Sequence, residues 1–321
     1  MTGFSEECGP AAAVKVFFLA GFMGVPGEFA RVRELISEDS REILPEDLLP
    51  SPEETRELLQ RRDLPPDYFF REARARLRKI ITASGAERVC LYGYSLGGRL
   101  ALSALFMSPE YKAECAAEYE WENKAENETK TPENGLKNSP EYPGDLRRDW
   151  PMISGLILES SGLGIRDPEE RRRRLLHDEN LARRFAAEFS PELLREWYTQ
   201  PVFAGLSSRV RESLIQKRRH IKGEEAARVL SCLSSGRMPW LLPALEASRE
   251  LPVLLLTGER DPKYQALLKS VTGPDIALLT VPHAGHNIHD EVPEETARII
   301  EDFLRNRCQV PGRESLRTPE I

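Results

Sequence analysis

Cysteine is scarce in this chain, and its residues have neither the number nor the spacing of a disulfide framework or a metal site. An odd, scattered set is typical of a reducing compartment; the five residues are Cys8, Cys90, Cys115, Cys232 and Cys308. No run approaches the ~20 apolar residues of a membrane-spanning helix. The first residues include Glu6 and Glu7 and no basic segment, so we expect no secretory signal and a cytoplasmic protein.

Positive charge is also in deficit, because 45 Lys and Arg face 52 Asp and Glu and leave a net charge of −7. Such a balance is poorly suited to nucleic acid or to an anionic membrane, so we expect neither as a partner. The sequence contains neither a cluster of metal ligands nor a glycine-rich phosphate loop. We therefore expect no metal and no organic cofactor.

What the chain does contain is an alternation of apolar runs and amphipathic segments. Continuous apolar runs, typical of buried parallel strands, occupy 14–20, 88–92, 153–158, 252–257 and 276–281, and a short strand and turn is predicted at 43–49. Helical patterns occupy 26–38, 67–84, 96–107 and 294–304. Strands that alternate with helices predict an α/β protein with a mostly parallel, doubly wound sheet.

Two segments interrupt this alternation. Residues 109–150 are polar and acidic, with turn-forming residues and almost no aliphatic periodicity, so we expect a flexible insert. Residues 166–250, called the lid below, show only helical patterns. We therefore expect a core domain made of 14–108, 151–165 and 251–306, with an inserted helical lid and with tails at 1–13 and 309–321.

The most specific motif is Gly93-Tyr94-Ser95-Leu96-Gly97, which follows an apolar strand and opens a helix. This is the G-x-S-x-G pattern in the strand–turn–helix context that holds a nucleophilic serine above a sheet. The turn is so tight that a Cβ at position 93 or 97 would collide with neighbouring backbone. The Leu96 N–H, at the helix N-terminus, is then a candidate oxyanion-hole donor.

An activated serine needs a base, and the base needs a group that orients it. In this fold the chain order is serine, acid, histidine. Asp261 follows the strand at 252–257, and His286 follows the strand at 276–281. Because parallel strands end at one edge of the sheet, we expect these groups to meet Ser95 there. Glu259 is the competing acid, and His283 and His289 are the competing bases.

Two further features surround this predicted triad. The loop after the first strand contains Gly21, and a backbone N–H near Phe22 is the candidate for a second oxyanion donor. Arg99 lies one helical turn after Ser95, where it suits a substrate carboxylate better than a neutral ester. From Arg166 to Lys222 the lid carries 14 Lys and Arg against 9 Asp and Glu. This excess indicates an anionic small-molecule substrate.

With these residues identified, the chain resembles a branch of the α/β-hydrolase fold, the 2-succinyl-6-hydroxy-2,4-cyclohexadiene-1-carboxylate synthases of menaquinone biosynthesis. The resemblance covers Val14 to Leu304 apart from the insert, and Ala20 departs from it where many members of the fold have histidine. It rests on the stretches GYSLGGRLAL, LESSGLG, ERRRRLLHDENLA, WYTQPVFAGL, GERDPKY and HAGHNIHDEVPE.

The resemblance implies a lyase that eliminates pyruvate from an enolpyruvyl cyclohexene carrying several carboxylates. Ser95 would then be a general base that passes its proton to His286, with Asp261 orienting the imidazole. The family pattern further implies substrate-binding roles for Arg99, Arg174, Arg218, Trp197, Tyr94 and Lys263. Arg218 and its neighbour Arg219 remain alternatives at one of these positions.

Two other functions fit parts of the pattern. A serine hydrolase of the same fold could cleave an ester or a carbon–carbon bond in an anionic substrate. A ligand receptor could keep the fold without catalysis, although an intact triad argues against that reading. For the synthase we expect a monomer or a weak homo-oligomer.

Overall fold

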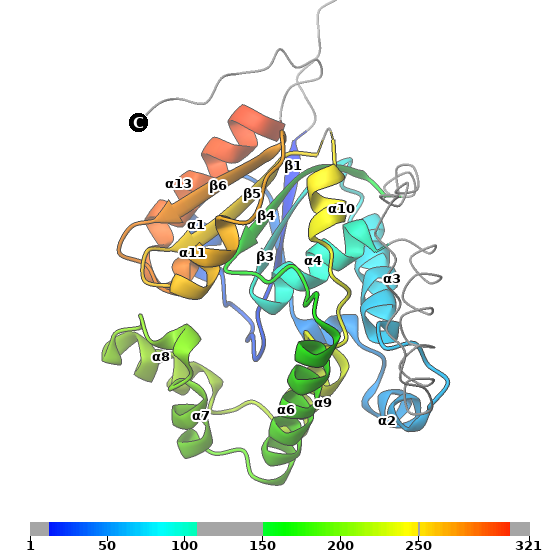
Figure 1. The fold of residues 1–321 in the computed structure, drawn as a ribbon. Coiled ribbons are helices and arrows are strands. Elements are labelled where there is room, and N and C mark those ends of the chain that lie inside the picture. Colours follow the sequence, from blue (N-terminus) through cyan, green and yellow to red (C-terminus); the bar gives the residue numbers. More distant parts are fainter. Residues whose placement is uncertain (1–12, 108–149, 250, 309–321) are drawn as a thin grey trace, which may run out of the picture.

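The computed structural model describes residues 13–107, 150–249 and 251–308. The predicted insert at 109–150, except Trp150, and the predicted tails, except Ala13, lie outside these residues. The described part forms one six-stranded sheet in which all neighbouring strands are parallel, in the order β2-β1-β3-β4-β5-β6 (Figure 1). The α/β prediction is therefore confirmed. The strands are β1 (Val14–Leu19), β2 (Ser40–Ile43), β3 (Arg88–Tyr94), β4 (Met152–Glu159), β5 (Val253–Gly258) and β6 (Ile276–Val281).

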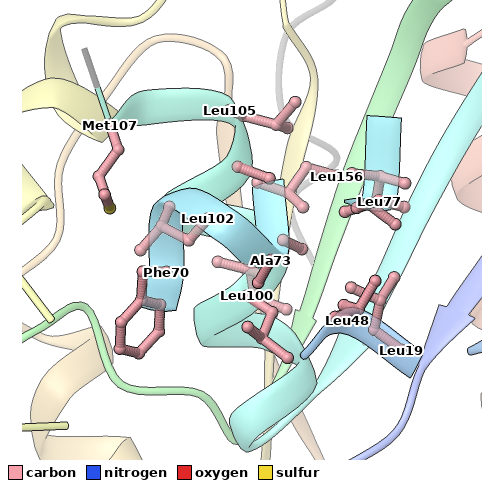
Figure 2. Packing of buried hydrophobic residues seen from close by; sticks show 14 of the residues in the cluster. Leu19, Leu48, Phe70, Ala73, Leu77, Leu100, Leu102, Leu105, Met107 and Leu156 are labelled. Atoms are coloured by element: carbon pink, nitrogen blue, oxygen red, sulfur yellow. The ribbon is translucent and has the colours of Figure 1, made fainter. Parts of the chain in front are cut away.

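Helices cover both faces of this sheet. On one face α1 (Ala30–Leu35) packs against α13 (Pro293–Phe303), and on the other α3 (Tyr68–Ala83) packs against α4 (Leu96–Phe106) (Figure 1). Because successive side chains of a strand point to opposite faces, β1 supplies both cores. Val16 and Phe18 pack with the α1 and α13 side, whereas Phe17 and Leu19 pack with α3 and α4. Figure 2 shows the second core, where Leu19 and Leu156 of the sheet face Leu77 and Leu100 of the helices.

The lid forms a chain of helices at one end of the sheet (Figure 1). It has an apolar core of its own, which includes Phe185, Leu194, Phe203 and Leu214. Its last helix, α10, instead packs through Leu245 into the core of the sheet. The lid elements are α6 (Pro168–Ala187), α7 (Pro191–Trp197), η2 (Pro201–Phe203), α8 (Ser208–Arg218), α9 (Gly223–Cys232) and α10 (Leu242–Ala247).

Two local predictions need correction, and one helix was missed. Of the short strand and turn predicted at 43–49, the strand lies earlier and ends at Ile43, and the turn is the short 3-10 helix η1 (Pro45–Leu48), because Pro45 cannot continue a ladder and the Leu44 N–H donates to Asp47 Oδ2 at 2.9 Å. The helix predicted at 26–38 shortens to α1, because turns that include Gly27 at φ 83° precede it. Helix α2 (Pro52–Gln60), capped by the Ser51 hydroxyl, was not predicted.

The remaining elements are the short helices α11 (Pro262–Leu268) and α12 (Ile288–Glu291) and the closing π-helical turn η3 (Leu304–Cys308). The first two begin in the loops that follow β5 and β6, so they position the residues after the carboxyl ends of these strands. No helix among the described ranges is long and apolar enough to cross a membrane.

The turn between β3 and α4 leaves no space for a side chain at Gly97, as the sequence predicts. A Cβ there would lie 2.0 Å from the Leu19 carbonyl oxygen and 2.7 Å from that of Ala20. We expect Gly97→Ala to lower the free energy of unfolding by about 3 kcal/mol, because backbone must move to admit the methyl group. Urea unfolding measures this loss.

Gly162→Ala is the matched control, because a Cβ at Gly162 would meet no atom within 4 Å. Its free energy of unfolding is expected to stay within about 0.5 kcal/mol of the unsubstituted protein. Equal stability losses for the two variants would contradict the close packing of this turn.

Candidate active site

Ser95 lies at the junction of β3 and α4 in a conformation that side chains rarely adopt. Its φ and ψ are 51° and −106°, and such a backbone is typical of functional sites that the surrounding structure holds in place. The Ser95 N–H donates to the Glu159 carbonyl at 2.9 Å, and a Cβ at Gly93 would lie 2.4 Å from Gly98 Cα. Neighbouring strands and a backbone without Cβ atoms therefore hold this serine half-buried above the sheet.

Asp261 and His286 come from the loops after β5 and β6 and meet Ser95 at this edge. His286 Nδ1 lies 2.8 Å from Asp261 Oδ2, and His286 Nε2 lies 3.3 Å from Ser95 Oγ. Asp261 also caps α11, where its Oδ1 accepts from the Tyr264 N–H at 3.4 Å. Both side chains are buried. Asp261 is thus held by the start of α11 and in turn fixes the orientation of the His286 imidazole.

The competing residues lie elsewhere. Glu259 and His283 are exposed, and the His283 N–H donates to Glu259 Oε2 at 2.9 Å. His289 is buried, but its Nδ1 faces Glu159 at 2.9 Å rather than Asp261. The residues that come together with Ser95 are therefore Asp261 and His286.

Three aromatic rings from different elements surround the imidazole of His286. Tyr94, Phe203 and Tyr264 have ring centroids 5.4, 5.5 and 5.3 Å from it. Sequence reasoning identified Tyr94 but not the other two. Phe203 lies within WYTQPVFAGL and Tyr264 within GERDPKY, so the motifs contained a signal for both. Because these rings exclude water around the imidazole, they strengthen its interactions with Ser95 and Asp261.

The two candidate oxyanion donors lie in two different loops at the carboxyl ends of β1 and β3. Leu96 is the first residue of α4, and Phe22 lies in the turn after β1, which the Gly24 N–H closes on the Gly21 carbonyl at 3.0 Å. A Cβ at Gly21 would lie 2.6 Å from the Tyr94 ring, so only glycine lets this turn approach so closely. The Phe22 ring packs on Trp197 with centroids 5.1 Å apart, which links this turn to the lid. Ala20 is buried beneath the turn.

Two of the predicted arginines, Arg99 and Arg174, lie close to each other. Arg99 begins the second turn of α4, where its N–H donates to the Ser95 carbonyl at 3.2 Å and its Nη1 donates to the Leu233 carbonyl at 3.3 Å. Burial lowers the pKa of Arg99 to about 10, and the positive charge of Arg174 is the next cause. Arg174 Nε donates to Asp178 at 2.8 and 2.9 Å, and Asp178 also accepts from the Ser234 hydroxyl.

The remaining predicted residues divide into inward and outward groups. Arg218 is only 2% exposed and pairs with the buried Glu28, whereas Arg219 is exposed and bonds to His220 and Gln216. Of the two alternatives, Arg218 therefore points inward.

Lys263 is exposed, with its Nζ 5.2 Å from the centroid of the Tyr264 ring. Trp197, in contrast, is half-buried and packs on Phe22 and Phe203.

One group of acidic and histidine side chains in the described ranges is compact enough to hold a metal ion. It consists of Glu28, His289 and Asp290, whose ligand atoms lie within 4.8 Å of one another. Glu28 already pairs with Arg218, and Asp290 accepts from Lys217 Nζ at 2.5 Å. Two cations therefore already neutralise the carboxylates, which disfavours a metal ion at this group.

Comparisons with known proteins identify the family of this chain. The model of the alpha/beta hydrolase family matches residues 16–299. The chain is 32% identical to the 2-succinyl-6-hydroxy-2,4-cyclohexadiene-1-carboxylate synthase of Yersinia enterocolitica over 242 residues, which are 75% of this chain and 72% of that protein. It is 38% identical to the synthase of Photorhabdus laumondii over 161 residues, which are 50% of this chain and 55% of the relative.

Solved structures support the same fold. MenH from S. aureus superposes with a TM-score of 0.64 at 22% identity, covering 92% of this chain and 94% of that one. A thermophilic esterase from Thermogutta terrifontis superposes with a TM-score of 0.57 at 18% identity, covering 93% and 92%. The chain thus belongs to the alpha/beta hydrolase family and, within it, to the family of the 2-succinyl-6-hydroxy-2,4-cyclohexadiene-1-carboxylate synthases.

Proposed function

We propose that this chain eliminates pyruvate from 2-succinyl-5-enolpyruvyl-6-hydroxy-3-cyclohexene-1-carboxylate and forms 2-succinyl-6-hydroxy-2,4-cyclohexadiene-1-carboxylate in menaquinone biosynthesis. It is then a carbon–oxygen lyase on a hydrolase fold. The family relationship supports this reaction. The observation that carries it is the pair of neighbouring guanidinium groups of Arg99, on the helix that Ser95 begins, and Arg174, on the lid helix α6, because a substrate with three carboxylates needs cations.

The reaction begins with removal of the proton from the ring carbon that bears the succinyl group. Ser95 Oγ takes this proton while its own passes to His286 Nε2, 3.3 Å away. Asp261 holds the imidazole and stabilises its charged form. The electron pair shifts through the ring double bond, the bond to the enolpyruvyl oxygen breaks, and the leaving group departs as the enolate of pyruvate. The proton held by His286 then returns, through Ser95 or water, to this enolate, which becomes pyruvate and leaves the triad ready for the next substrate. A 3-cyclohexene thereby becomes a 2,4-diene without an acyl-enzyme.

Loss of the ring proton puts negative charge on the oxygen of the succinyl ketone. The backbone N–H groups of Phe22 and Leu96 are the proposed donors to that oxygen. Leu96 begins α4, so the positive end of the helix dipole adds to its hydrogen bond. Donors that are already oriented stabilise such charge most effectively, because they need no reorganisation during the reaction.

The three substrate carboxylates have three proposed partners, Arg99, Arg174 and Arg218. Among the residues that the structure describes, Asp178 binds Arg174 through Nε, and we propose that the terminal nitrogens of that guanidinium bind the ligand. Tyr94 and Trp197 would shape the apolar wall around the ring. Lys263, which is exposed, would act only at the rim of the site.

We infer further that the enzyme works in the cytoplasm as a monomer or weak homo-oligomer on this anionic small molecule. The cysteines that the structure describes, Cys90, Cys232 and Cys308, are buried free thiols, which suits a reducing compartment.

We expect Ser95→Ala and His286→Ala each to lower kcat for pyruvate release by about 10²–10⁴-fold, because each removes a group that moves the proton. A coupled assay for pyruvate measures the loss, and urea unfolding checks that the variants are folded. Release within tenfold of the unsubstituted enzyme in folded Ser95→Ala would contradict the role of this serine as the base.

Arg99→Ala and Arg174→Ala are expected to lower kcat/KM by roughly 10- to 150-fold, the loss of about 1.5–3 kcal/mol from a charge-assisted hydrogen bond. Arg173→Ala is the matched control, because Arg173 is an exposed neighbour on the same helix. Its kcat/KM should stay within twofold. If Arg99→Ala also stayed within twofold (~0.4 kcal/mol), Arg99 would not bind a carboxylate.

A further inference from the structure

Glu28 and Arg218 form a buried ion pair between the lid and the core. Arg218 ends α8, and Glu28 lies in the loop that follows the Phe22 turn. Their side chains are 2% and 0% exposed, and Arg218 Nη2 donates to Glu28 Oε1. The other Glu28 oxygen accepts from the Val25 N–H at 3.3 Å. The carboxylate is thus fixed by its own loop, and the arginine is brought to it from the lid.

Arg218 keeps unused hydrogen-bonding capacity at this buried position. Its Nε and Nη1 are buried and have no hydrogen-bond partner among the residues that the structure describes. Unsatisfied buried donors cost free energy and occur mainly where a ligand or water completes them. The charge of Arg218 opposes the burial-driven rise in the pKa of Tyr94, so the guanidinium lies near the residue before Ser95. A ligand carboxylate could complete these donors.

The pair is the end of a row of alternating charges. His289 Nε2 lies 3.7 Å from Glu28 Oε1, and His289 Nδ1 lies 2.9 Å from both oxygens of Glu159, which also accepts from the Tyr92 hydroxyl at 2.5 Å. Burial opposes the charge of His289, but Glu159 and Glu28 raise its pKa to about 10. Burial likewise opposes the charge of Glu28, but Arg218 and His289 lower its pKa to about 2. His289 and Glu28 are therefore both charged at neutral pH.

This row of charges contacts the segments that hold two members of the triad, His286 and Ser95. His289 follows His286 by three residues, and its N–H donates to Glu159 Oε1 at 3.1 Å. The Glu159 carbonyl accepts from the Ser95 N–H. Through His289 and Glu159, Glu28 is therefore linked to the loop of His286 and to the turn of Ser95.

We propose that Glu28 is a positioning residue that holds the Arg218 guanidinium toward the substrate's carboxylate in register with Ser95 and His286. The inference rests on the proposed function, in which Arg218 binds a carboxylate. Because that contact lies away from the reacting proton, its loss removes binding that ground state and transition state share. The expected effect is a higher KM at a nearly unchanged kcat.

The test compares Glu28→Gln, Glu28→Asp, Arg218→Met and the double variant Glu28→Gln/Arg218→Met in the pyruvate assay. We expect Glu28→Gln and Arg218→Met each to raise KM at least tenfold with kcat within threefold. Glu28→Asp should return KM to within threefold of the unsubstituted enzyme. In the double variant, KM should equal that of Arg218→Met alone, because Glu28 acts only through Arg218.

Stability is measured separately, because Glu28→Gln leaves an unpaired buried charge. The double variant removes both charges, so it should resist urea better than Glu28→Gln while keeping the high KM. Should Glu28→Gln fail to fold, Glu28→Asp and the double variant still decide the question. Glu42→Gln is the control, since Glu42 accepts from Gly27 and Phe29 of the same loop without bonding to Arg218. Its KM should stay within twofold.

Three outcomes would overturn the inference. A KM for Glu28→Gln within twofold of normal would do so and leave the proposed function intact. If the increases in KM caused by the two substitutions multiplied in the double variant, Glu28 would act independently of Arg218. A normal KM for Arg218→Met would remove the inference together with the carboxylate role of Arg218.

If the unsubstituted enzyme released no pyruvate, the proposed function would fail. Calorimetric binding of succinate would then test the pairing alone. Weaker binding by both Glu28→Gln and Arg218→Met would support it, and unchanged binding by Glu28→Gln would overturn it.

Discussion

The turn between β3 and α4 leaves Ser95 in a left-handed conformation with glycine on both sides, and the site is arranged around it. Because Gly97 lies directly against the backbone at the end of β1, the Phe22 turn and the start of α4 are held together. Leu96 and Arg99 follow Ser95 in the first two turns of α4, so the same contact also fixes where this helix begins. A strained backbone is maintained because the strands on both sides of β3 and the turn after β1 fix it.

Two groups of charged side chains surround this turn. In the first, Arg99 and Arg174 lie close to each other, and Asp178 binds Arg174. In the second, Glu159, His289, Glu28 and Arg218 follow one another and are almost wholly buried. The net charge of −7 does not reveal this arrangement, because the excess of acidic residues in the rest of the chain is larger than the excess of basic residues in the lid. The positions of the charges therefore carry information that their sum does not.

The sequence predicted what depends on local order and failed where distant partners decide. The turn at Ser95 and the places of Asp261 and His286 could be predicted, because each of these residues directly follows an apolar strand in the sequence. The pairing of Glu28 with Arg218 was not, since 190 residues separate them. His289 was a competing base in the sequence, because its partner Glu159 lies 130 residues away. Only this contact shows that His289 does not face Asp261. In the short strand and turn predicted at 43–49, the structure places the strand before Leu44, because Pro45 lacks the N–H that a strand needs and begins a 3-10 helix instead.

An elimination and a hydrolysis can use the same three residues, so the products must distinguish them. The most direct measurement follows the purified enzyme with the enolpyruvyl cyclohexene and, in parallel, with a chromogenic butyrate ester. The account predicts one pyruvate for each diene formed, with slow ester turnover and no acyl group on Ser95. Rapid ester hydrolysis with acylation of Ser95, and no pyruvate from the cyclohexene, would contradict it.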